Sequence, residues 1–418
     1  MRRVCVFALL LIVIPSAGSS ADEFYIRNND RVVFYGDSIT EQRLYTTFVE
    51  TYVVTRFPKM PVNFVHSGWG GDRVTGGGGG PIDLRLKRDV FAYKPTVMSI
   101  MLGMNDASYR PFDEAVFNTY STGMEKIVTK VKETIPAIRI TLIQPSPFDD
   151  VTRPPTVKGG YNSVLVRYGE FLKGLASSAN VDLADLNTPV VEATKKAFAL
   201  DPKEAHALNP DRVHPAPGGQ LLMAAALLDA WHAPALVSEV ELKVEGDKVA
   251  NEAKRTKVSD LKHQAGKLSW TQLDESLPFP INLSDSATAL AVKSSDIVNQ
   301  LNRQILEVEN LPADKYVLKI DGEVVGHFSK KELAEGINLA ILPTKMVEQA
   351  RKVHELTIKH NEIHYRRWRA VEVTFQGLDS PHIGKALAEL DAFEQDVVNA
   401  QREAAQPKPH TFELEPEA

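Results

Sequence analysis

The sequence is poor in cysteine, with one in 418 residues, which excludes a disulfide framework and a zinc site built from cysteines. It has no excess of positive charge either. Its 48 Lys and Arg against 54 Asp and Glu give a net charge of −6, whereas nucleic-acid binding requires a basic surface. The apolar run at residues 4–14 is too short for a membrane-spanning helix, which needs about 20 residues. We therefore expect no nucleic-acid partner and no membrane span.

The first 21 residues have the features of a secretory signal peptide. Arg2 and Arg3 precede the apolar run, and small residues follow it up to Ala21. We expect cleavage after Ala21. The mature protein is then secreted or periplasmic, and it contains no cysteine.

The pattern from residue 22 to about 235 predicts an α/β domain. Short apolar runs, predicted as strands, occur at 32–35, 62–65, 97–102, 138–143 and 181–183. Longer helical stretches separate them at 44–56, 113–134 and 161–179. Such alternation indicates a parallel sheet covered by helices on both faces, a three-layer α/β/α fold. Functional sites in such folds form at the carboxyl ends of the strands.

Four polar motifs fall at these predicted strand ends or just before a late helix. They are Gly36-Asp37-Ser38-Ile39, Gly70-Gly71-Asp72, Gly103-Met104-Asn105-Asp106 and Asp211-Arg212-Val213-His214-Pro215. A serine at a strand-to-helix turn presents its hydroxyl at the sheet edge, and a glycine lets backbone N–H groups approach a ligand oxygen. An aspartate three residues before a histidine can accept from Nδ1 and leave Nε2 free as a base. Each motif alone has a structural explanation, but four in order indicate a catalytic site.

This set of motifs resembles the SGNH, or GDSL-type, hydrolase family over residues 31 to about 232. The Ser, Gly, Asn and His that name the family correspond in order to Ser38, Gly71, Asn105 and His214. Ile39 stands where the GDSL name has Leu, a common departure. The resemblance implies a flavodoxin-like catalytic domain.

The resemblance also implies a role for each matching residue. Ser38 would be the nucleophile, His214 the general base and acid, and Asp211 the partner that orients His214. The oxyanion hole would consist of the backbone N–H groups of Ser38 and Gly71 and the side-chain amide of Asn105. No metal and no cofactor are expected.

These residues predict a secreted serine ester hydrolase that acts through an acyl-enzyme intermediate. The segments 70–80, 105–111 and 144–160 are rich in Gly, Asp, Pro and Arg and carry no long apolar stripe that could form a lipase lid. They favour a small-molecule or polysaccharide substrate with a short acyl group, such as an acetylated carbohydrate. A lipase or thioesterase, and a non-catalytic binding protein that retains the fold, remain alternatives.

A different pattern begins near residue 236. Alternating strands, among them a hairpin around Asp321-Gly322, predict a smaller α+β region at 236–402. Helices are expected at 284–309, 345–371 and 383–402, and a disordered tail at 403–418. The role of the region is left open between carbohydrate binding, oligomerisation and a cover over the active site.

Three features of this region bear on its role. Trp270 is the one obvious candidate for an exposed, sugar-binding aromatic. His360 and His364 lie four apart on a predicted helix, but the spacing of the intervening Glu does not fit a zinc protease. We expect them on a solvated helix face. The segment 365–369 mixes Arg with aromatic residues, which favours a packed helix with cation–π contacts.

Overall fold

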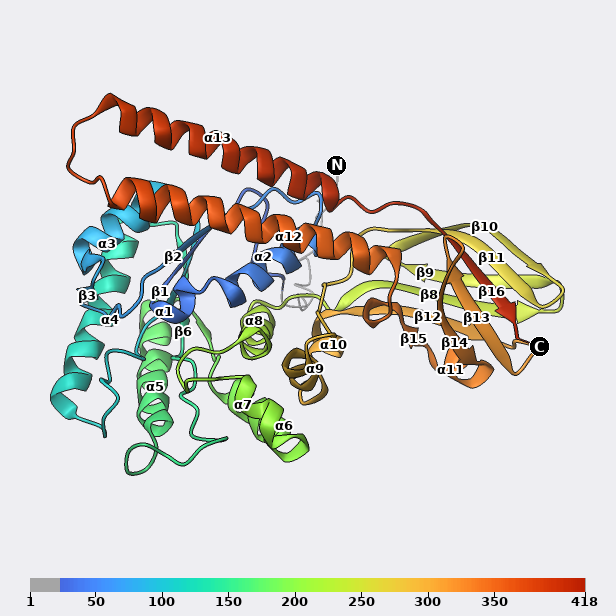
Figure 1. Cartoon of the computed structure of the whole chain (residues 1–418), viewed down its shortest axis with the longest axis horizontal. Coiled ribbons are helices and arrows are strands. Elements are labelled where there is room, and N and C mark those ends of the chain that lie inside the picture. The colour runs from blue at the N-terminus through green and yellow to red at the C-terminus, as the bar shows by residue number, and fades with distance from the viewer. Residues whose placement is uncertain (1–22, 418) are drawn as a thin grey trace, which may run out of the picture.

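The computed structural model describes residues 23–417, so the predicted signal peptide lies outside the described part of the chain. The first half forms a five-stranded parallel sheet with the strand order β2-β1-β5-β6-β7 (Figure 1). Its strands are β1 (Arg31–Gly36), β2 (Asn63–Gly68), β5 (Val97–Met101), β6 (Arg139–Ile143) and β7 (Asp182–Ala184). Most of their residues are buried, as expected for a sheet covered on both faces. The predicted parallel sheet is confirmed.

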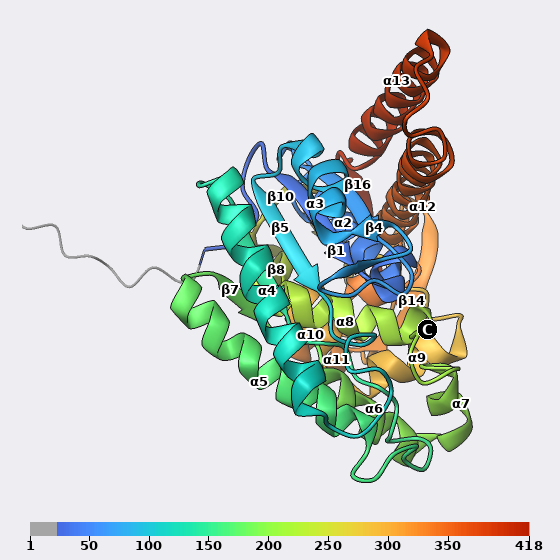
Figure 2. The same cartoon turned by 90° about the vertical axis from the view of Figure 1, so that its left-hand side faces the viewer.

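Helices cover both faces of this sheet (Figure 2). On one face lie α3 (Ile82–Asp89), α4 (Glu114–Thr134) and α5 (Tyr161–Ala179). On the other, α2 (Leu44–Arg56) packs against α8 (Pro217–Ala230). The helices predicted at 44–56 and 161–179 are confirmed with the same bounds. Within residues 23–417, no helix is both long and apolar enough to cross a membrane.

The second half begins with a strand-rich region made of two sheets. One has the order β15-β12-β8-β9 and the other β10-β11-β16-β13-β14. Their strands are β8 (Leu236–Glu245), β9 (Lys248–Lys254), β10 (Thr256–Gln264), β11 (Lys267–Asp274), β12 (Arg303–Glu309), β13 (Lys315–Ile320), β14 (Glu323–Ser329), β15 (Ile337–Asn338) and β16 (His410–Pro416). The predicted hairpin at Asp321-Gly322 joins β13 to β14.

The helix predicted at 284–309 is wrong. The segment contains two short helices, α9 (Ser286–Lys293) and α10 (Ile297–Leu301), and then β12. In β12 the buried residues Gln304, Leu306 and Val308 alternate with more exposed ones, which is the period of a strand. Pairing with β8 supplies the backbone hydrogen bonds that a helix would otherwise make internally.

The disordered tail predicted at 403–418 is also wrong. Residues 410–416 form β16, which lies between β11 and β13. Phe412 and Leu414 are buried, so the alternation that marks a strand is present even in this acidic segment. The carboxylates of Glu413 and Glu415 lie 2.9 and 2.7 Å from Nζ of Lys267, which offsets their charge.

Trp270 does not serve as an exposed aromatic platform. Its indole is 1% exposed and stacks on the ring of Phe412, with 5.0 Å between the ring centroids. The tryptophan that suggested sugar binding is therefore part of the buried core of the strand-rich region.

A long helical hairpin connects the strand-rich region back to the domain that holds the parallel sheet (Figure 1). It consists of α12 (Lys345–Tyr365), the π-helical segment η3 (Arg366–Val373) and α13 (Pro381–Ala404). α12 packs against α2 and against α13. We call these three elements the C-terminal hairpin.

The expectation that His360 and His364 lie on a solvated face is wrong, because both belong to α12 of the C-terminal hairpin and both are buried. Nδ1 of His360 lies 2.8 Å from Oε1 of Glu50 on α2, and its Nε2 lies 3.0 Å from Oε1 of Glu394 on α13. Nε2 of His66 lies 3.2 Å from the other oxygen of Glu50. The sequence missed this cluster because the carboxylate partners lie far away along the chain.

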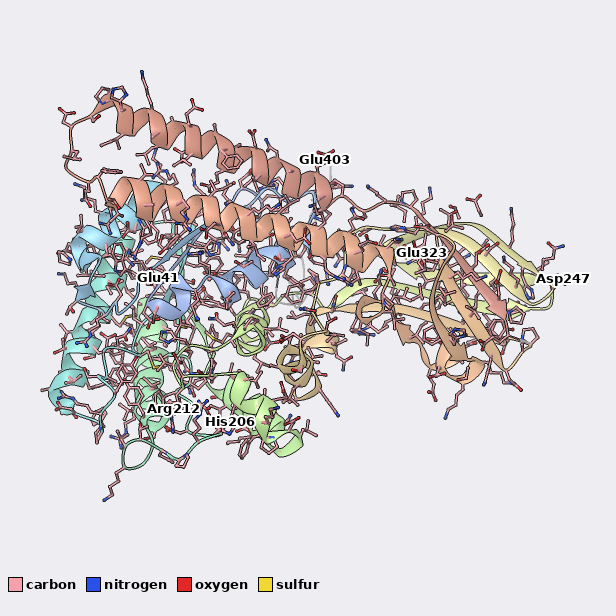
Figure 3. The ribbon with its side chains drawn as sticks, viewed as in Figure 1. Glu41, His206, Arg212, Asp247, Glu323 and Glu403 are labelled. Carbon is pink, nitrogen blue, oxygen red and sulfur yellow. The ribbon has the colours of Figure 1, made fainter. Side chains whose placement is uncertain are left out.

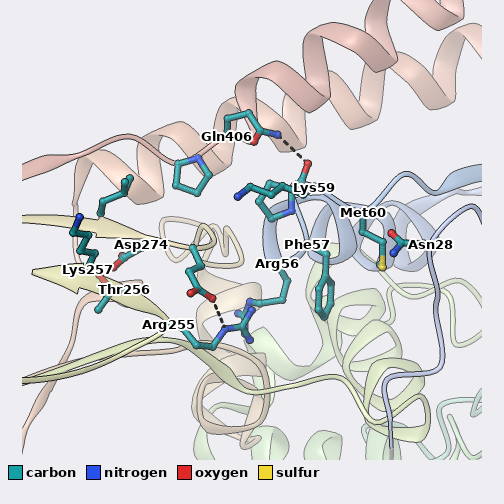
Figure 4. A pocket seen from close by; sticks show the side chains of 14 residues that line it. Asn28, Arg56, Phe57, Lys59, Met60, Arg255, Thr256, Lys257, Asp274 and Gln406 are labelled. Atoms are coloured by element: carbon teal, nitrogen blue, oxygen red, sulfur yellow. Dashed lines mark hydrogen bonds and ion pairs between the residues drawn. The ribbon is translucent and has the colours of Figure 1, made fainter.

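A cleft of about 780 Å³ lies between the parallel-sheet domain and the strand-rich region (Figure 4). Arg56 and Lys59 line it from the end of α2, and Arg255 and Lys257 line it from the strand-rich region. None of its lining residues belongs to the four motifs, so this cleft is separate from the site that the sequence predicts.

Candidate active site

Ser38 lies directly after β1 and opens the short helix α1 (Ser38–Glu41). Oδ1 of Asp37 caps this helix by accepting from the backbone N–H of Ile39 at 3.0 Å. The turn requires Gly36, because a Cβ there would lie 2.3 Å from Oγ1 of Thr40 and 2.8 Å from the backbone oxygen of Met101. The Gly-Asp-Ser sequence therefore brings the serine hydroxyl to the carboxyl end of the central strands.

His214 reaches this hydroxyl from the loop that precedes α8. Its Nε2 lies 2.8 Å from Oγ of Ser38, and its Nδ1 lies 2.7 Å from Oδ2 of Asp211. The other oxygen of Asp211 accepts from the backbone N–H groups of Val213 and His214, at 2.9 and 2.7 Å. The chain turns tightly here, with φ of +75° at Arg212. The three side chains that the sequence singled out thus form one continuous hydrogen-bonded row.

Asp211 keeps its charge despite partial burial. Desolvation acts to raise its pKa, but the hydrogen bonds from the backbone and the ring of His214 lower the pKa below the usual aspartate value. The side chain remains 55% exposed. An ionised Asp211 favours a proton on Nδ1 of His214, and Nε2 then faces Ser38 as an acceptor.

Gly71 and Asn105 lie at the same edge of the sheet. Gly71 has a φ of +76°, which a glycine adopts without strain. Nδ2 of Asn105 lies 3.1 Å from the backbone oxygen of Asp72 and 3.4 Å from Oδ2 of Asp37. Gly103 also has a positive φ, and a Cβ there would lie 2.6 Å from the ring of Pro145. The close approach fixes the loop that carries Asn105.

Three buried aspartates, for which the sequence motifs predicted no role, surround these residues. Burial, followed by the negative charges of Asp106 and Asp72, raises the pKa of Asp37 to about 7. Burial also raises the pKa of Asp106 to about 6 and that of Asp72 above its usual value. The sequence could have indicated that they lie at the site, because each of these aspartates is adjacent in the chain to Ser38, Asn105 or Gly71.

Tyr109 is a further residue of the site that the sequence did not indicate. Its hydroxyl donates to Oδ1 of Asn105 at 3.1 Å, and its ring stacks on Tyr161 with 5.1 Å between centroids. Tyr109 and Ser108 both have positive φ values, 55° and 60°. This strained turn leaves the ring of Tyr109 42% exposed beside the predicted oxyanion-hole amide.

The fold and this site define a class of enzyme. The chain contains a GDSL-like lipase/acylhydrolase domain, since its residues 34–222 match the model of that family. It is therefore a carboxylic ester hydrolase.

Several known proteins are similar to this chain. The catalytic domain is 24% identical over 225 residues to an acetylxylan esterase of Geobacillus stearothermophilus, a match that covers 49% of this chain and 94% of that protein. The solved structure of a gut microbial diltiazem-metabolizing enzyme has a TM-score of 0.80 and 25% identity, and the match covers 95% of this chain and 99% of that one. The second similarity extends over the strand-rich region and the C-terminal hairpin as well as the catalytic domain.

Proposed function

We propose that this protein is a serine ester hydrolase that removes short acyl groups, acetyl in particular, from carbohydrates. The observation that carries the proposal is the row Ser38–His214–Asp211, in which Nε2 of His214 lies 2.8 Å from Oγ of Ser38. A serine hydroxyl is a weak nucleophile until an adjacent base takes its proton.

In the proposed reaction, Oγ of Ser38 attacks the ester carbonyl carbon while its proton moves to Nε2 of His214. The bond to the alcohol oxygen then breaks, and that oxygen takes the proton from Nε2, which leaves the acyl group on Ser38. A water molecule, deprotonated by Nε2 of His214, then attacks the carbonyl carbon of the acyl-enzyme. The bond from the acyl group to Oγ of Ser38 breaks, Oγ takes the proton back from Nε2, and the carboxylic acid leaves. Asp211 stabilises the protonated imidazole in both halves of the reaction.

The negative charge on the former carbonyl oxygen needs fixed donors. We assign this role to the backbone N–H groups of Ser38 and Gly71 and to Nδ2 of Asn105. The 3.4 Å contact from Nδ2 to Oδ2 of Asp37 is long for a hydrogen bond. One N–H of the Asn105 amide can therefore turn to the oxyanion at little cost.

The carbohydrate substrate is supported by two observations. The relative from Geobacillus stearothermophilus is an acetylxylan esterase, and the exposed ring of Tyr109 lies beside Asn105. A tyrosine ring offers an apolar face and a polar edge, which suits a sugar ring. The N-terminal segment with Arg2, Arg3 and the run 4–14 further supports an exported enzyme.

Acetate release from acetylated xylan, together with a p-nitrophenyl ester series, tests this function. We expect acetate to be released, and kcat/KM to be higher for the acetyl ester than for the octanoyl ester. The opposite order would favour a lipase or thioesterase. Absence of hydrolysis and of labelling by a fluorophosphonate probe would indicate a binding protein that retains the fold.

A further inference from the structure

Arg369, on the π-helical segment η3 of the C-terminal hairpin, contacts the catalytic domain beside the active site. Its Nη2 lies 2.9 Å from Oε1 of Glu41, the last residue of α1. Its guanidinium carbon lies 3.3 Å from the ring centroid of Trp69, so the two groups stack. Glu41 lies on the catalytic domain near the end of the hairpin farthest from the strand-rich region (Figure 3). Arg369 therefore touches both the helix that Ser38 opens and the loop that carries Gly71.

Glu41 also binds the loop that carries Gly71, residues 67–72, which we call the glycine loop. Its other oxygen, Oε2, accepts from the backbone N–H of Gly70 at 2.7 Å. A Cβ on Gly70 would lie 3.9 Å from Cβ of Ser38, so this peptide lies alongside the proposed nucleophile. Two consecutive glycines, Gly70 and Gly71, leave the backbone free to rotate. A hydrogen bond to Glu41 removes that freedom at the peptide just before the proposed oxyanion-hole N–H.

Trp368, the neighbour of Arg369, fixes the other side of the same loop. Its Nε1 donates to Oδ1 of Asp89 at 2.7 Å, and Asp89 pairs with the buried Arg85. Arg85 in turn donates to the backbone oxygen of Ser67 at 2.9 Å and to Asp72 at 2.8 Å. The loop from Ser67 to Asp72 is thus held at both ends. π-Helical turns are rare and occur frequently at functional sites.

We propose that Arg369 is a positioning residue for the oxyanion hole, acting through Glu41 on the Gly70–Gly71 backbone. This inference rests on the proposed function, and it gives the C-terminal hairpin a part in ester hydrolysis. In this proposal, the hairpin supports the glycine loop through the contacts of Arg369 with Glu41 and Trp69. Removing Arg369 leaves Glu41 without its cationic partner and takes away the closest of the three arginines that lie over the ring of Trp69. The Gly71 N–H then departs from the position that the oxyanion needs.

Steady-state kinetics of Arg369→Ala on p-nitrophenyl acetate tests the proposal. The oxyanion forms only along the reaction, so kcat falls while KM changes little. We expect a decrease in kcat of about 10- to 100-fold, since a displacement of about 1 Å can cost 100-fold, and a KM within about threefold of the parent value. Arg369→Lys, which keeps the charge without the planar fork, is expected to fall between the two.

Glu362→Gln is the matched control. Oε2 of Glu362 pairs with Nη2 of Arg43 at 3.1 Å, so this ion pair also joins the C-terminal hairpin to the catalytic domain. Arg43 also donates to the backbone oxygen of Glu41 at 3.3 Å, but not to the Glu41 carboxylate that holds Gly70. We expect kcat of Glu362→Gln to stay within twofold of the parent. An equal decrease in kcat for Arg369→Ala and Glu362→Gln would mean that Arg369 only helps to attach the hairpin, and it would overturn the proposal.

A double-mutant cycle with Glu41→Ala gives an independent readout. If Arg369 acts through Glu41, the double variant is no slower than the slower single variant, because the two residues act in series. Additive losses, or a parent-like kcat in Arg369→Ala, overturn the proposal. Where Arg369→Ala does not fold, judged by near-UV circular dichroism, Arg369→Lys and Glu41→Ala carry the comparison. A parent without any esterase activity would instead contradict the proposed function itself.

Discussion

Nε2 of His214 lies 2.8 Å from Oγ of Ser38, although 176 positions separate the two residues in the chain. The parallel sheet makes this contact possible, because the turn after β1 and the loop before α8 meet at the same edge. Local hydrogen bonds also fix the backbone of each partner. Asp37 caps the helix that begins at Ser38, and Asp211 accepts hydrogen bonds from the backbone N–H groups of Val213 and His214. The geometry is therefore present before any substrate binds.

Replacing the hydroxyl tests whether Ser38 is the nucleophile. We expect Ser38→Ala to lower kcat by about 10⁴-fold or more, to the rate that binding and the oxyanion hole alone sustain. Labelling by a fluorophosphonate should disappear as well. The thermal midpoint should change little, which circular dichroism can establish. Activity within tenfold of the parent would assign the nucleophile to another residue.

Asp211→Asn isolates one hydrogen bond of the row. The amide oxygen of Asn can still accept from the N–H groups of Val213 and His214, but the charge that faces Nδ1 is lost. We expect kcat/KM to fall by about 100-fold, less than the roughly 10⁴-fold typical of a buried triad aspartate, because solvent reaches the half-exposed Asp211. A change below threefold would mean that His214 needs no orienting partner.

The buried cluster of Glu50, His360 and Glu394, where the C-terminal hairpin packs on α2, predicts a loss of stability at alkaline pH. Burial opposes a charge on His360, but the carboxylates of Glu50 and Glu394 raise its pKa from 6.5 to about 10. The folded state then holds a proton that the unfolded state releases above pH 6.5, so stability decreases as pH rises towards 10. We expect the thermal midpoint to fall between pH 7 and 10, and to fall less in His360→Gln. The exposed His382→Gln serves as control, and an equal slope in both variants would contradict the prediction.

The raised pKa of Asp37 means that the folded protein loses stability when this active-site carboxylate ionises. Burial and two neighbouring aspartates raise its pKa from 3.8 to about 7. Between these values the unfolded carboxyl is ionised while the folded one stays protonated, so this group lowers stability as pH rises. Asparagine does not titrate, and we expect Asp37→Asn to raise the thermal midpoint more at pH 8 than at pH 4. Asp113→Asn, at the exposed N-cap of α4, should show no such difference.

The contribution of β16 to stability can be tested at its buried residue Leu414. Leu414 is fully buried between β11 and β13, and removal of a buried leucine side chain costs about 2–5 kcal/mol. We expect Leu414→Ala to lower the free energy of unfolding by this amount in denaturant titrations. Thr411→Ala, on an exposed position of the same strand, should cost less than about 1 kcal/mol. Equal effects would mean that β16 is only loosely attached.

The catalytic domain was predictable because its signals are local. Most strands of its sheet are short, mainly apolar runs, and each motif lies within a few residues of a strand end or a helix start. Position along the chain therefore determines position at the sheet edge. The errors concern residues whose partners are distant. β12 and β16 are short segments that become strands only by pairing with β8, β11 and β13. Likewise, His360 looked solvated because Glu50 lies 310 positions away.

Arg369 was outside the reach of sequence reasoning for the same reason. The segment 365–369 correctly predicted a packed helix with cation–π contacts. Nothing in its sequence indicated that the aromatic partner would be Trp69 of the glycine loop. The contact depends on where the C-terminal hairpin lies on the catalytic domain, and the packing of α12 against α2 decides that.

The central place of β16 has a consequence for biosynthesis. This strand follows every other described element along the chain, yet β11 and β13 pair only through it. During translation the five-stranded sheet therefore stays open, with two unpaired strand edges, until residues 410–416 leave the ribosome. The α12–α13 hairpin emerges just before, and its base adjoins this unfinished sheet. A chain that stops before residue 410 would keep Ser38 and His214 but would have an incomplete, aggregation-prone sheet. Such a truncation is therefore expected to lower the yield of soluble enzyme.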